Sequence, residues 1–217
     1  MLDNQQRELE QGLGSLGISF TAQQVDRLLA FLAMLERWNK AFNLTSIHDP
    51  LQMLRLHVLD SAAIHHHIEG AVSVIDVGSG AGLPGIPLAI LNPQKHFTLL
   101  DSNGKKTRFI FQAITELGLC NVREINQRAE QYRPKTPFDT VTSRAFSSLP
   151  KMLKQCDHLV ASEGFFLAMK GKKPDLELSL ITKAYKVVDL VKIAVPNVDG
   201  ERHLVKIKKQ ALGHNTN

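Results

Sequence analysis

Hydrophobic and polar positions alternate in a helical rhythm over the first third of the chain. After a capping-box pattern at Thr21, apolar residues recur at intervals of three and four, which places them on one helix face. This pattern predicts a helix over residues 21–40. A second apolar face begins just after an Asp-Pro pair, a common helix-start signal, and it predicts a helix over residues 50–68. Because both helices precede the first predicted strand, we expect residues 1–70 to form a helical cap.

From residue 72 the pattern changes to short apolar stretches of strand length. Seven strands are predicted, over residues 72–77, 96–101, 122–126, 140–143, 164–170, 185–195 and 203–208. Helical patterns lie between the first five stretches, and such alternation is typical of a parallel sheet built from right-handed crossovers. The last two stretches are joined by a loop of hairpin length, so we expect them to pair antiparallel. Residues 71–210 are therefore predicted to form a Rossmann-like α/β core with a seven-stranded, mostly parallel sheet flanked by helices.

The composition is that of an ordinary globular protein and excludes several other classes. With 217 residues, 43% hydrophobic and 22% charged, the chain is long enough for one domain with a full core, and we expect a single domain over residues 1–217. It contains no apolar run of about 20 residues, the length needed to cross a bilayer, and its first residues lack the basic and apolar regions of a secretion signal. We therefore expect a cytoplasmic protein that has no membrane partner.

No group of residues has the spacing of a metal site. The two cysteines, Cys120 and Cys156, lie far apart, and they are interpreted as small hydrophobic side chains. The consecutive histidines at residues 65–67 would point in different directions on a helix, so they are interpreted as a solvated helix end. No metal cofactor is predicted.

Charge changes sign along the chain. The net charge is +5, yet residues 1–76 carry 5 basic and 9 acidic side chains, whereas residues 103–173 carry 13 basic and 6 acidic ones. A basic middle segment favours a polyanionic partner such as nucleic acid, although proteins that bind nothing charged also have basic faces. Basic residues near the predicted strand ends and loops are the candidate contacts to RNA, namely Lys105, Lys106, Arg108, Lys170, Lys172, Lys173, Arg202 and His203.

A glycine-rich turn, VIDVGSGAGLPGIP at residues 74–87, follows the first predicted strand. In an open α/β sheet, ligands bind at the carboxyl ends of the strands, and glycines there let a ligand approach the backbone closely. The spacing of Gly78, Gly80 and Gly82 is GxGxG, whereas a dinucleotide-binding fold requires GxGxxG. The turn therefore favours a nucleoside ligand without a pyrophosphate. Asp76, on the strand itself, is a further candidate cofactor contact.

A carboxylate ends the next predicted strand. Asp101 follows an apolar stretch that begins at residue 96, and it lies 19 residues after Gly82. At this distance from a glycine turn, its carboxylate is placed to accept hydrogen bonds from both hydroxyls of a ribose. The combination of Asp76, the GxGxG turn and Asp101 resembles the class I S-adenosylmethionine-dependent methyltransferases. That resemblance implies the sheet already inferred from the pattern, seven strands with one antiparallel strand.

The end of the fourth predicted strand bears on the reaction. Methyltransferases that modify exocyclic amines resemble one another in an Asn/Asp-Pro-Pro-aromatic sequence at this point, whose acceptors receive the hydrogens of the amine. This chain has Ser143-Arg144-Ala145-Phe146 instead, which fits a ring nitrogen with a free lone pair, such as guanine N7. We expect Arg144 to hold the cofactor's carboxylate or an RNA phosphate, and Phe146 either to stack on a base or to lie in the core. Arg144 and Lys170 are the candidate catalytic residues.

Six segments point to a narrower family. They are WNKAFNLT at residues 38–45, HVLDS at 57–61, GLPGIP at 82–87, Asp101-Ser102 followed by Lys105, SRAF at 143–146 and GERHL at 200–204. Together they resemble the bacterial 16S ribosomal RNA guanine-N7 methyltransferases, formerly called glucose-inhibited division protein B. The likeness spans about residues 21–208, with the segments in the expected order.

The resemblance implies S-adenosylmethionine as cofactor, N7 of one guanine in 16S ribosomal RNA as target, and the assembled small (30S) ribosomal subunit as partner. The family's cofactor contacts fall on Gly78, Leu83, Ala129, Glu130 and Arg144 of this chain. Gly78 and Arg144 are also reached from the residue pattern, whereas Ala129 and Glu130 come from the resemblance alone. We expect the protein to act as a monomer.

Other functions stay open at the level of sequence. The enzyme could methylate a different RNA base or a protein side chain. The glycine turn could serve a nicotinamide-dependent oxidoreductase, although the early third glycine and Leu83 oppose this. The fold could also bind a nucleotide without catalysis, as a regulator does.

Overall fold

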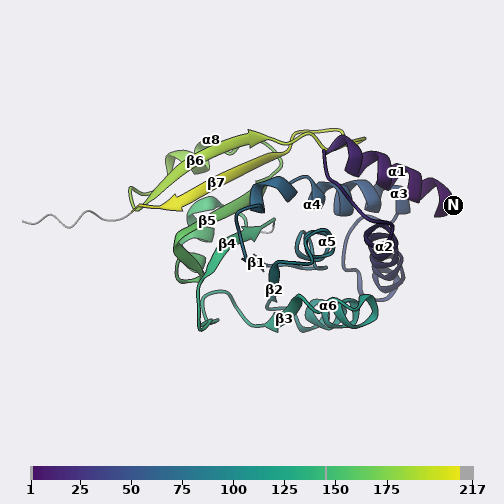
Figure 1. Cartoon of the computed structure of the whole chain (residues 1–217). Coiled ribbons are helices and arrows are strands. Elements are labelled where there is room, and N and C mark those ends of the chain that lie inside the picture. The colour runs from purple at the N-terminus through teal and green to yellow at the C-terminus, as the bar shows by residue number, and fades with distance from the viewer. Residues whose placement is uncertain (1, 145, 211–217) are drawn as a thin grey trace, which may run out of the picture.

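The computed structural model describes residues 2–144 and 146–210, and at its centre is a sheet of seven strands (Figure 1). The strands are β1 (Ser73–Val77), β2 (His96–Asp101), β3 (Val122–Asn126), β4 (Phe138–Ser143), β5 (Val160–Lys170), β6 (Tyr185–Lys192) and β7 (His203–Lys209). Their spatial order is β3-β2-β1-β4-β5-β7-β6. Strands β1 to β5 run parallel, whereas β7 lies between β5 and β6 and is antiparallel to both. The predicted mostly parallel sheet closed by a hairpin is confirmed.

The register brings the ends of the central strands to one edge of the sheet. Asp76 of β1 lies beside Leu99 of β2 on one side and Thr142 of β4 on the other. Four of the five residues of β1 are buried, which explains why this strand is a nearly continuous apolar run. The carboxyl edge therefore gathers the residues that follow Val77, Asp101 and Ser143.

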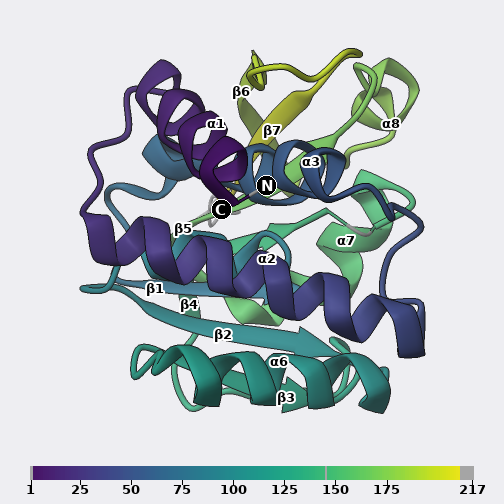
Figure 2. The same ribbon diagram turned by 90° about the vertical axis from the view of Figure 1, so that its right-hand side faces the viewer.

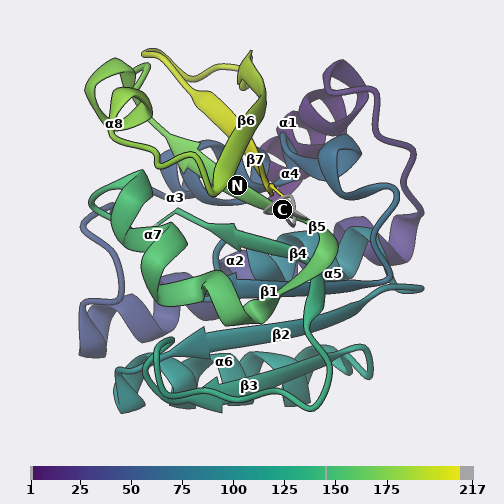
Figure 3. The same cartoon turned by 90° about the vertical axis from the view of Figure 1, so that its left-hand side faces the viewer.

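Helices cover both faces of the sheet. They are α1 (Leu2–Ser15), α2 (Ala22–Phe42), α3 (Pro50–Met53), η1 (Leu54–Leu59), α4 (Asp60–Ala62), η2 (His65–Ile68), α5 (Gly85–Leu91), α6 (Gly104–Leu117), α7 (Leu149–Cys156), η3 (Asp157–Leu159) and α8 (Asp175–Ser179). Figure 2 shows α2 and α6 in front of the sheet, and Figure 3 shows α7 in front of the opposite face. Helix α2 packs on α5 and α6, which in turn pack on β2.

Helix α2 forms where the capping box predicts a helix. The Thr21 hydroxyl accepts the backbone N–H of Gln24 over 3.2 Å, and the Gln24 side chain accepts the Thr21 N–H over 2.9 Å. The helix ends at Asn43, which has a left-handed conformation with φ 49°. On its buried face, the Phe31 ring lies 6.1 Å from the ring of Phe109 in α6, so the cap and the α/β core share one apolar cluster.

The segment predicted as one helix over residues 50–68 is helical in four successive pieces. Helix α3 passes directly into the π-helix η1, and α4 and the 3-10 helix η2 follow. Single π-turns inside helices are frequent at functional sites. Here the π-helix and the residue after it bury two polar side chains, His57 and Asp60, against the rest of the molecule.

Several sequence predictions differ from the structure, including the start of β4, which is Phe138 rather than residue 140. A helix was expected between β3 and β4, but residues 127–137 are irregular, because Pro134 and Pro137 interrupt any helix there. Helices α1 and α8 were not predicted, since α1 offers only a short apolar face and α8 has no buried residue. Strand β5 begins at Val160 rather than at residue 164, and β6 ends at Lys192 rather than at residue 195.

The histidines at residues 65–67 form the 3-10 helix η2, where they make separate contacts. Nδ1 of His65 lies 3.1 Å from the amide nitrogen of Asn92, and Nδ1 of His66 lies 2.6 Å from a carboxylate oxygen of Glu69. Within residues 2–144 and 146–210, no group of three potential ligands could hold a metal ion. The described helices also include none with the length and hydrophobicity of a transmembrane segment.

Candidate active site

The glycine turn after β1 adopts a backbone that favours glycine. Gly78 and Gly82 have φ values of +71° and +76°, in the left-handed region where other L residues are strained. A Cβ on Gly82 would lie 2.5 Å from Cδ1 of Ile86, so the first turn of α5 packs directly on this glycine. The backbone of the turn is therefore exposed to a ligand on one side and closely packed on the other.

Asp76 supports this turn from beneath. Its Oδ2 accepts the Ser79 hydroxyl over 2.6 Å and the Gly85 N–H over 3.0 Å. The residue is fully buried, and burial raises the pKa of its carboxyl to about 6. Among the described residues, its Oδ1 is the one buried side-chain oxygen or nitrogen without a hydrogen-bond partner. The structure places this predicted cofactor contact inside the turn.

Asp101 joins the end of β2 to the same turn. Its Oδ2 accepts the N–H of Gly80 over 2.8 Å, and its Oδ1 accepts the N–H of Asn103 over 2.8 Å. Each carboxylate oxygen has two acceptor positions, so both oxygens keep capacity for a further donor. The backbone thus fixes the carboxylate while leaving it able to bind vicinal hydroxyls.

A cavity of about 410 Å³ lies at the carboxyl ends of β1, β2 and β3. Its lining includes six residues selected from the sequence, which are Gly78, Asp101, Lys106, Ala129, Glu130 and Phe146. Phe146 is half-buried against the apolar cluster of the α7 face, so it contributes both to the cavity and to the core. The Ala145 beside it lies outside the described residues.

A second cavity, of about 280 Å³, adjoins the first and shares Gly78 and Lys106 with it. It runs along the glycine turn past Gly80 and Leu83 to Arg144. Residues 44–46 and His57 of the helical cap form its opposite wall. The turn is therefore covered by a segment that precedes the sheet in the chain.

A third cavity, of about 320 Å³, shares His57 and Arg144 with the second. Its lining includes three more of the predicted residues, Lys170, Arg202 and His203. The three cavities thus lie next to one another along the carboxyl edge. The series begins at the ends of β1 to β3, passes the glycine turn, and ends between the cap and strands β5 and β7.

Arg144 stands at the junction of the second and third cavities. Its Nη1 donates to the carbonyl oxygen of Leu56 over 3.0 Å and to Oδ2 of Asp60 over 3.2 Å. Oδ1 of the same carboxylate accepts Nε of Arg202 over 2.9 Å. Two predicted cations, one directly after β4 and one directly before β7, are therefore joined through one buried carboxylate of the cap.

His57 lies at the same junction as a neutral ring. Nδ1 lies 3.0 Å from the carbonyl of Leu56, which only accepts, so Nδ1 carries the proton and Nε2 accepts the Thr45 hydroxyl at 2.9 Å. Burial, together with the nearby charge of Arg144, lowers the pKa of His57 to about 4. The ring is therefore uncharged at neutral pH.

The remaining basic candidates are dispersed. Nζ of Lys170 pairs with Glu177 over 2.8 Å and donates to the carbonyl of Phe146 over 3.2 Å. Lys172 is exposed, and Lys173 pairs with Asp175 over 2.7 Å. Of the three basic residues at the start of α6, Lys106 lines the first two cavities, whereas Lys105 and Arg108 are exposed on the helix.

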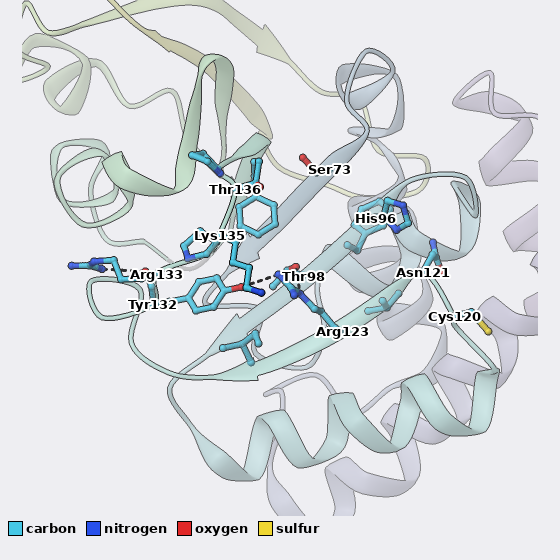
Figure 4. A pocket seen from close by; sticks show the side chains of 16 residues that line it. Ser73, His96, Thr98, Cys120, Asn121, Arg123, Tyr132, Arg133, Lys135 and Thr136 are labelled. Atoms are coloured by element: carbon cyan, nitrogen blue, oxygen red, sulfur yellow. Dashed lines mark hydrogen bonds between the residues drawn. The ribbon is translucent and has the colours of Figure 1, made fainter.

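A larger cavity, of about 650 Å³, lies at the opposite edge of the sheet (Figure 4). It opens where the irregular segment 127–137 replaces the expected helix, and it is lined by the first residues of β1 to β4. Figure 4 shows Arg123 extended across it, where the guanidinium donates to Thr98 over 3.0 Å and to Tyr132 over 2.9 Å. None of the residues selected from the sequence lines this cavity.

Sequence reasoning missed Thr45, His57 and Asp60 as site residues. They belong to the segments WNKAFNLT and HVLDS, which carried the family resemblance but received no role. The signal for His57 and Asp60 was the presence of polar residues within the apolar helical pattern of residues 50–68, whereas Thr45 lies in a loop and gave no such signal. A polar residue buried in such a pattern indicates a hydrogen-bonded site rather than a solvated face.

Comparisons with known proteins agree with this geometry. The family model of GidB, described as rRNA small subunit methyltransferase G, matches residues 24–205. Ribosomal RNA small subunit methyltransferase G of Shewanella amazonensis is 48% identical over 202 residues, covering 93% of this chain and 98% of the relative. The protein of that name from Shigella flexneri is 50% identical over 200 residues, covering 92% and 96%.

Solved structures support the fold alone, since their sequences are distant. A SAM-dependent methyltransferase from Aquifex aeolicus aligns with a TM-score of 0.58 and 19% identity, over 76% of this chain and 96% of that one. The ribosomal protein L11 methylase from Lactobacillus delbrueckii aligns with a TM-score of 0.55 and 16% identity, over 70% and 77%. With the fold of class I methyltransferases and a family match across most of its length, the chain belongs to the GidB family, rRNA small subunit methyltransferase G.

Proposed function

We propose that this protein transfers a methyl group from S-adenosylmethionine to N7 of one guanine in 16S ribosomal RNA within the small subunit. The observation that carries the proposal is the series of three adjoining cavities at the carboxyl edge, which offers space for a nucleoside, for an amino-acid side chain and for a target base. Membership of the GidB family supports ribosomal RNA as the substrate.

The first two cavities fit S-adenosylmethionine. The adenosine would lie between Ala129 and the glycine turn, with its ribose hydroxyls donating to Asp101. The methionine part would follow the turn past Leu83 toward Arg144. An arginine has five N–H donors, so Arg144 can bind the cofactor's carboxylate while it still holds Asp60. When bound, the cofactor supplies a methyl group on a positively charged sulfur.

Methyl transfer to N7 makes few demands on acid–base chemistry. The N7 lone pair forms the new N–C bond as the C–S bond breaks, and the electron pair of that bond stays on sulfur. The positive charge moves to the guanine, and no proton has to leave. This agrees with the end of β4, where the Ser143 hydroxyl donates to the carbonyl of Val77 over 2.7 Å and no carboxylate stands among the described residues 143–146. Alignment of the reactants and exclusion of water are the main tasks left to the protein.

Basic residues in and beside the third cavity would position the RNA. Lys172 and Lys173 are exposed after β5, whereas Arg202, just before β7, and the buried His203, the first residue of β7, line the cavity itself. We propose that these residues, with Lys105 and Lys106 near the glycine turn, bind phosphates without reading the sequence.

We further propose that the cap of residues 1–70 and the core of residues 71–210 act as one methyltransferase domain. In this proposal the domain works as a monomer, on ribosomal subunits in the cytoplasm.

The direct test uses small subunits that lack the modification. Subunits from a strain without this gene are incubated with the pure protein and methyl-labelled cofactor, and the RNA is then mapped by mass spectrometry. We expect one 7-methylguanosine and no other labelled nucleotide. Label on another base or on a ribosomal protein would replace the proposed target, and no transfer in the presence of bound cofactor would overturn the enzymatic function.

A further inference from the structure

The third cavity contains a charged cluster whose carboxylate, Asp60, has no part in the cofactor site proposed above. Asp60, whose side chain is 5% exposed, bonds Arg144 through one carboxylate oxygen and Arg202 through the other. The three residues come from α4, from the segment after β4 and from the segment before β7. A buried carboxylate held by two guanidinium groups from different elements has one fixed orientation toward the cavity it lines.

The remaining walls of this cavity are mainly apolar. Leu56 and Ile64 come from the cap, whereas Met169 and Ile193 come from β5 and the segment after β6. A volume of about 320 Å³ is at the small end of the range for ligand pockets, which suits one planar base better than a longer piece of RNA. Apolar walls around a few fixed polar groups are the usual means of holding and orienting a small ligand such as a base.

We propose that this cavity receives the target guanine and that Asp60 reads its Watson–Crick edge. The inference rests on the proposed function, because it names the site and the reader of the same substrate. Guanine presents two adjacent donors on that edge, N1–H and the N2 amino group, and a carboxylate is the complementary acceptor. Both oxygens of Asp60 already accept one arginine N–H, and each keeps an acceptor position for the base.

This orientation suits the reaction. N7 lies on the opposite side of the guanine ring from N1 and N2, so a base read by Asp60 keeps its N7 lone pair free to face the methyl group. His57 and Arg144 line both this cavity and the neighbouring cofactor cavity, so they mark the junction between the two. The carboxylate also stands near a ring that becomes positively charged on methylation, and the attraction is larger in the product than in the substrate.

The same contact discriminates against adenine. Adenine presents a lone pair at N1, which would face the carboxylate and repel it, and it has no amino group at C2. A purely structural role for the Asp60 cluster, as an ion pair that holds the cap on the sheet, predicts no sensitivity to the groups on the base. The two roles therefore differ in a measurable way.

The test combines a change in the protein with a change in one atom group of the RNA. Small subunits are reconstituted with either guanosine or inosine at the target position, since inosine lacks only the N2 amino group. For the unaltered protein we expect kcat/KM to fall about tenfold or more with inosine. For Asp60→Asn we expect a low kcat/KM with guanosine. The further fall with inosine should be less than about threefold, because the substitution and the missing N2 amino group remove the same contact.

Two further variants keep the outcome interpretable. Asp139→Asn is the control, because this carboxylate accepts the backbone N–H groups of Val72 and Ser73 at the far end of the sheet. This variant should keep the full inosine penalty, that is, the same fall in kcat/KM from guanosine to inosine as the unaltered protein. Asp60→Glu retains the charge and moves it by one methylene, so it serves if Asp60→Asn does not give a cooperative thermal unfolding transition. We expect Asp60→Glu to lose most of the inosine penalty too.

An equal rate of methylation of guanosine and inosine by the unaltered protein would overturn the assignment of Asp60 and leave the proposed function intact. An inosine penalty that is the same in the unaltered protein and in the Asp60 variants would also overturn it. Failure of the unaltered protein to methylate guanosine would instead refute the proposed function.

Discussion

The backbone N–H of Gly80 donates a 2.8 Å hydrogen bond to the carboxylate of Asp101, which ties the glycine turn after β1 to the end of β2. Replacing Asp101 with alanine removes this bond together with the acceptor for the ribose hydroxyls. We expect Asp101→Ala to weaken cofactor binding by about 1–3 kcal/mol, measured by isothermal titration calorimetry. Asp26→Ala, on the exposed side of α2, is the control and should leave affinity unchanged. Unchanged affinity in Asp101→Ala would show that the carboxylate is not part of the site.

Gly82 has little space around it, since a Cβ there would lie 2.5 Å from Cδ1 of Ile86. We expect Gly82→Ala to lower the free energy of unfolding by about 1–3 kcal/mol in urea, because the new Cβ would meet Ile86 and φ is positive. Gly14→Ala is the matched control. No atom lies within 4 Å of a Cβ at this helical position, so the change should leave stability equal or raise it by up to about 1 kcal/mol. Equal stability of the two variants would contradict the strain described for the turn.

Burial of a neutral His57 gives stability a defined pH dependence. The pKa of His57 is lowered from 6.5 to about 4 on folding, so between these values the unfolded chain binds more protons than the native one. The contribution of this residue is fully present above pH 6.5 and is lost as pH falls toward 4. We expect the unaltered protein to lose stability relative to His57→Gln between pH 7 and pH 5, measured by urea unfolding at both values. A pH-independent difference would mean that His57 titrates normally.

The two lysines near the end of β5 should contribute differently to RNA binding. Lys172 is exposed, whereas the side chain of Lys170 is 12% exposed and paired with Glu177. We expect Lys172→Ala to weaken binding and to reduce the slope of log K against log salt by about 0.7–0.9, the value for one lost phosphate contact. Lys170→Ala should weaken binding with a smaller change in slope. The control is Lys186→Ala on β6, and a slope for Lys172→Ala equal to that control would remove Lys172 from the interface.

The parts of the fold that the sequence predicts well are those set by local chemistry. The capping box at Thr21 and the glycines after β1 each act through neighbouring backbone groups, so their outcome does not depend on distant contacts. The helix expected between β3 and β4 failed for a local reason as well, since two prolines outweigh an apolar pattern. The correct predictions and the wrong one therefore have the same basis, which is the interaction of residues that are close together in the chain.

The parts that could not be predicted depend on how the cap docks. Nothing in the pattern around Asp60 indicates that its carboxylate pairs with Arg144 and Arg202, which lie 84 and 142 positions further along the chain. That meeting is set by the packing of the cap on the carboxyl edge of the sheet, a tertiary contact with no periodic signature. For the same reason the sequence analysis predicted a cofactor carboxylate or an RNA phosphate as the partner of Arg144, but not that the carboxylate of Asp60 already accepts from one of its nitrogens.

The ion pair between Asp60 and Arg202 has a consequence for the time at which the third cavity can form during synthesis. The residues are 142 positions apart, and the strand that follows Arg202 is the last of the sheet to be translated and the neighbour of β5. A nascent chain that ends before residue 202 already contains the glycine turn and Asp101, and yet it lacks one wall of the third cavity. The third cavity can therefore be completed only after the C-terminal hairpin has been synthesised and β7 has paired with β5.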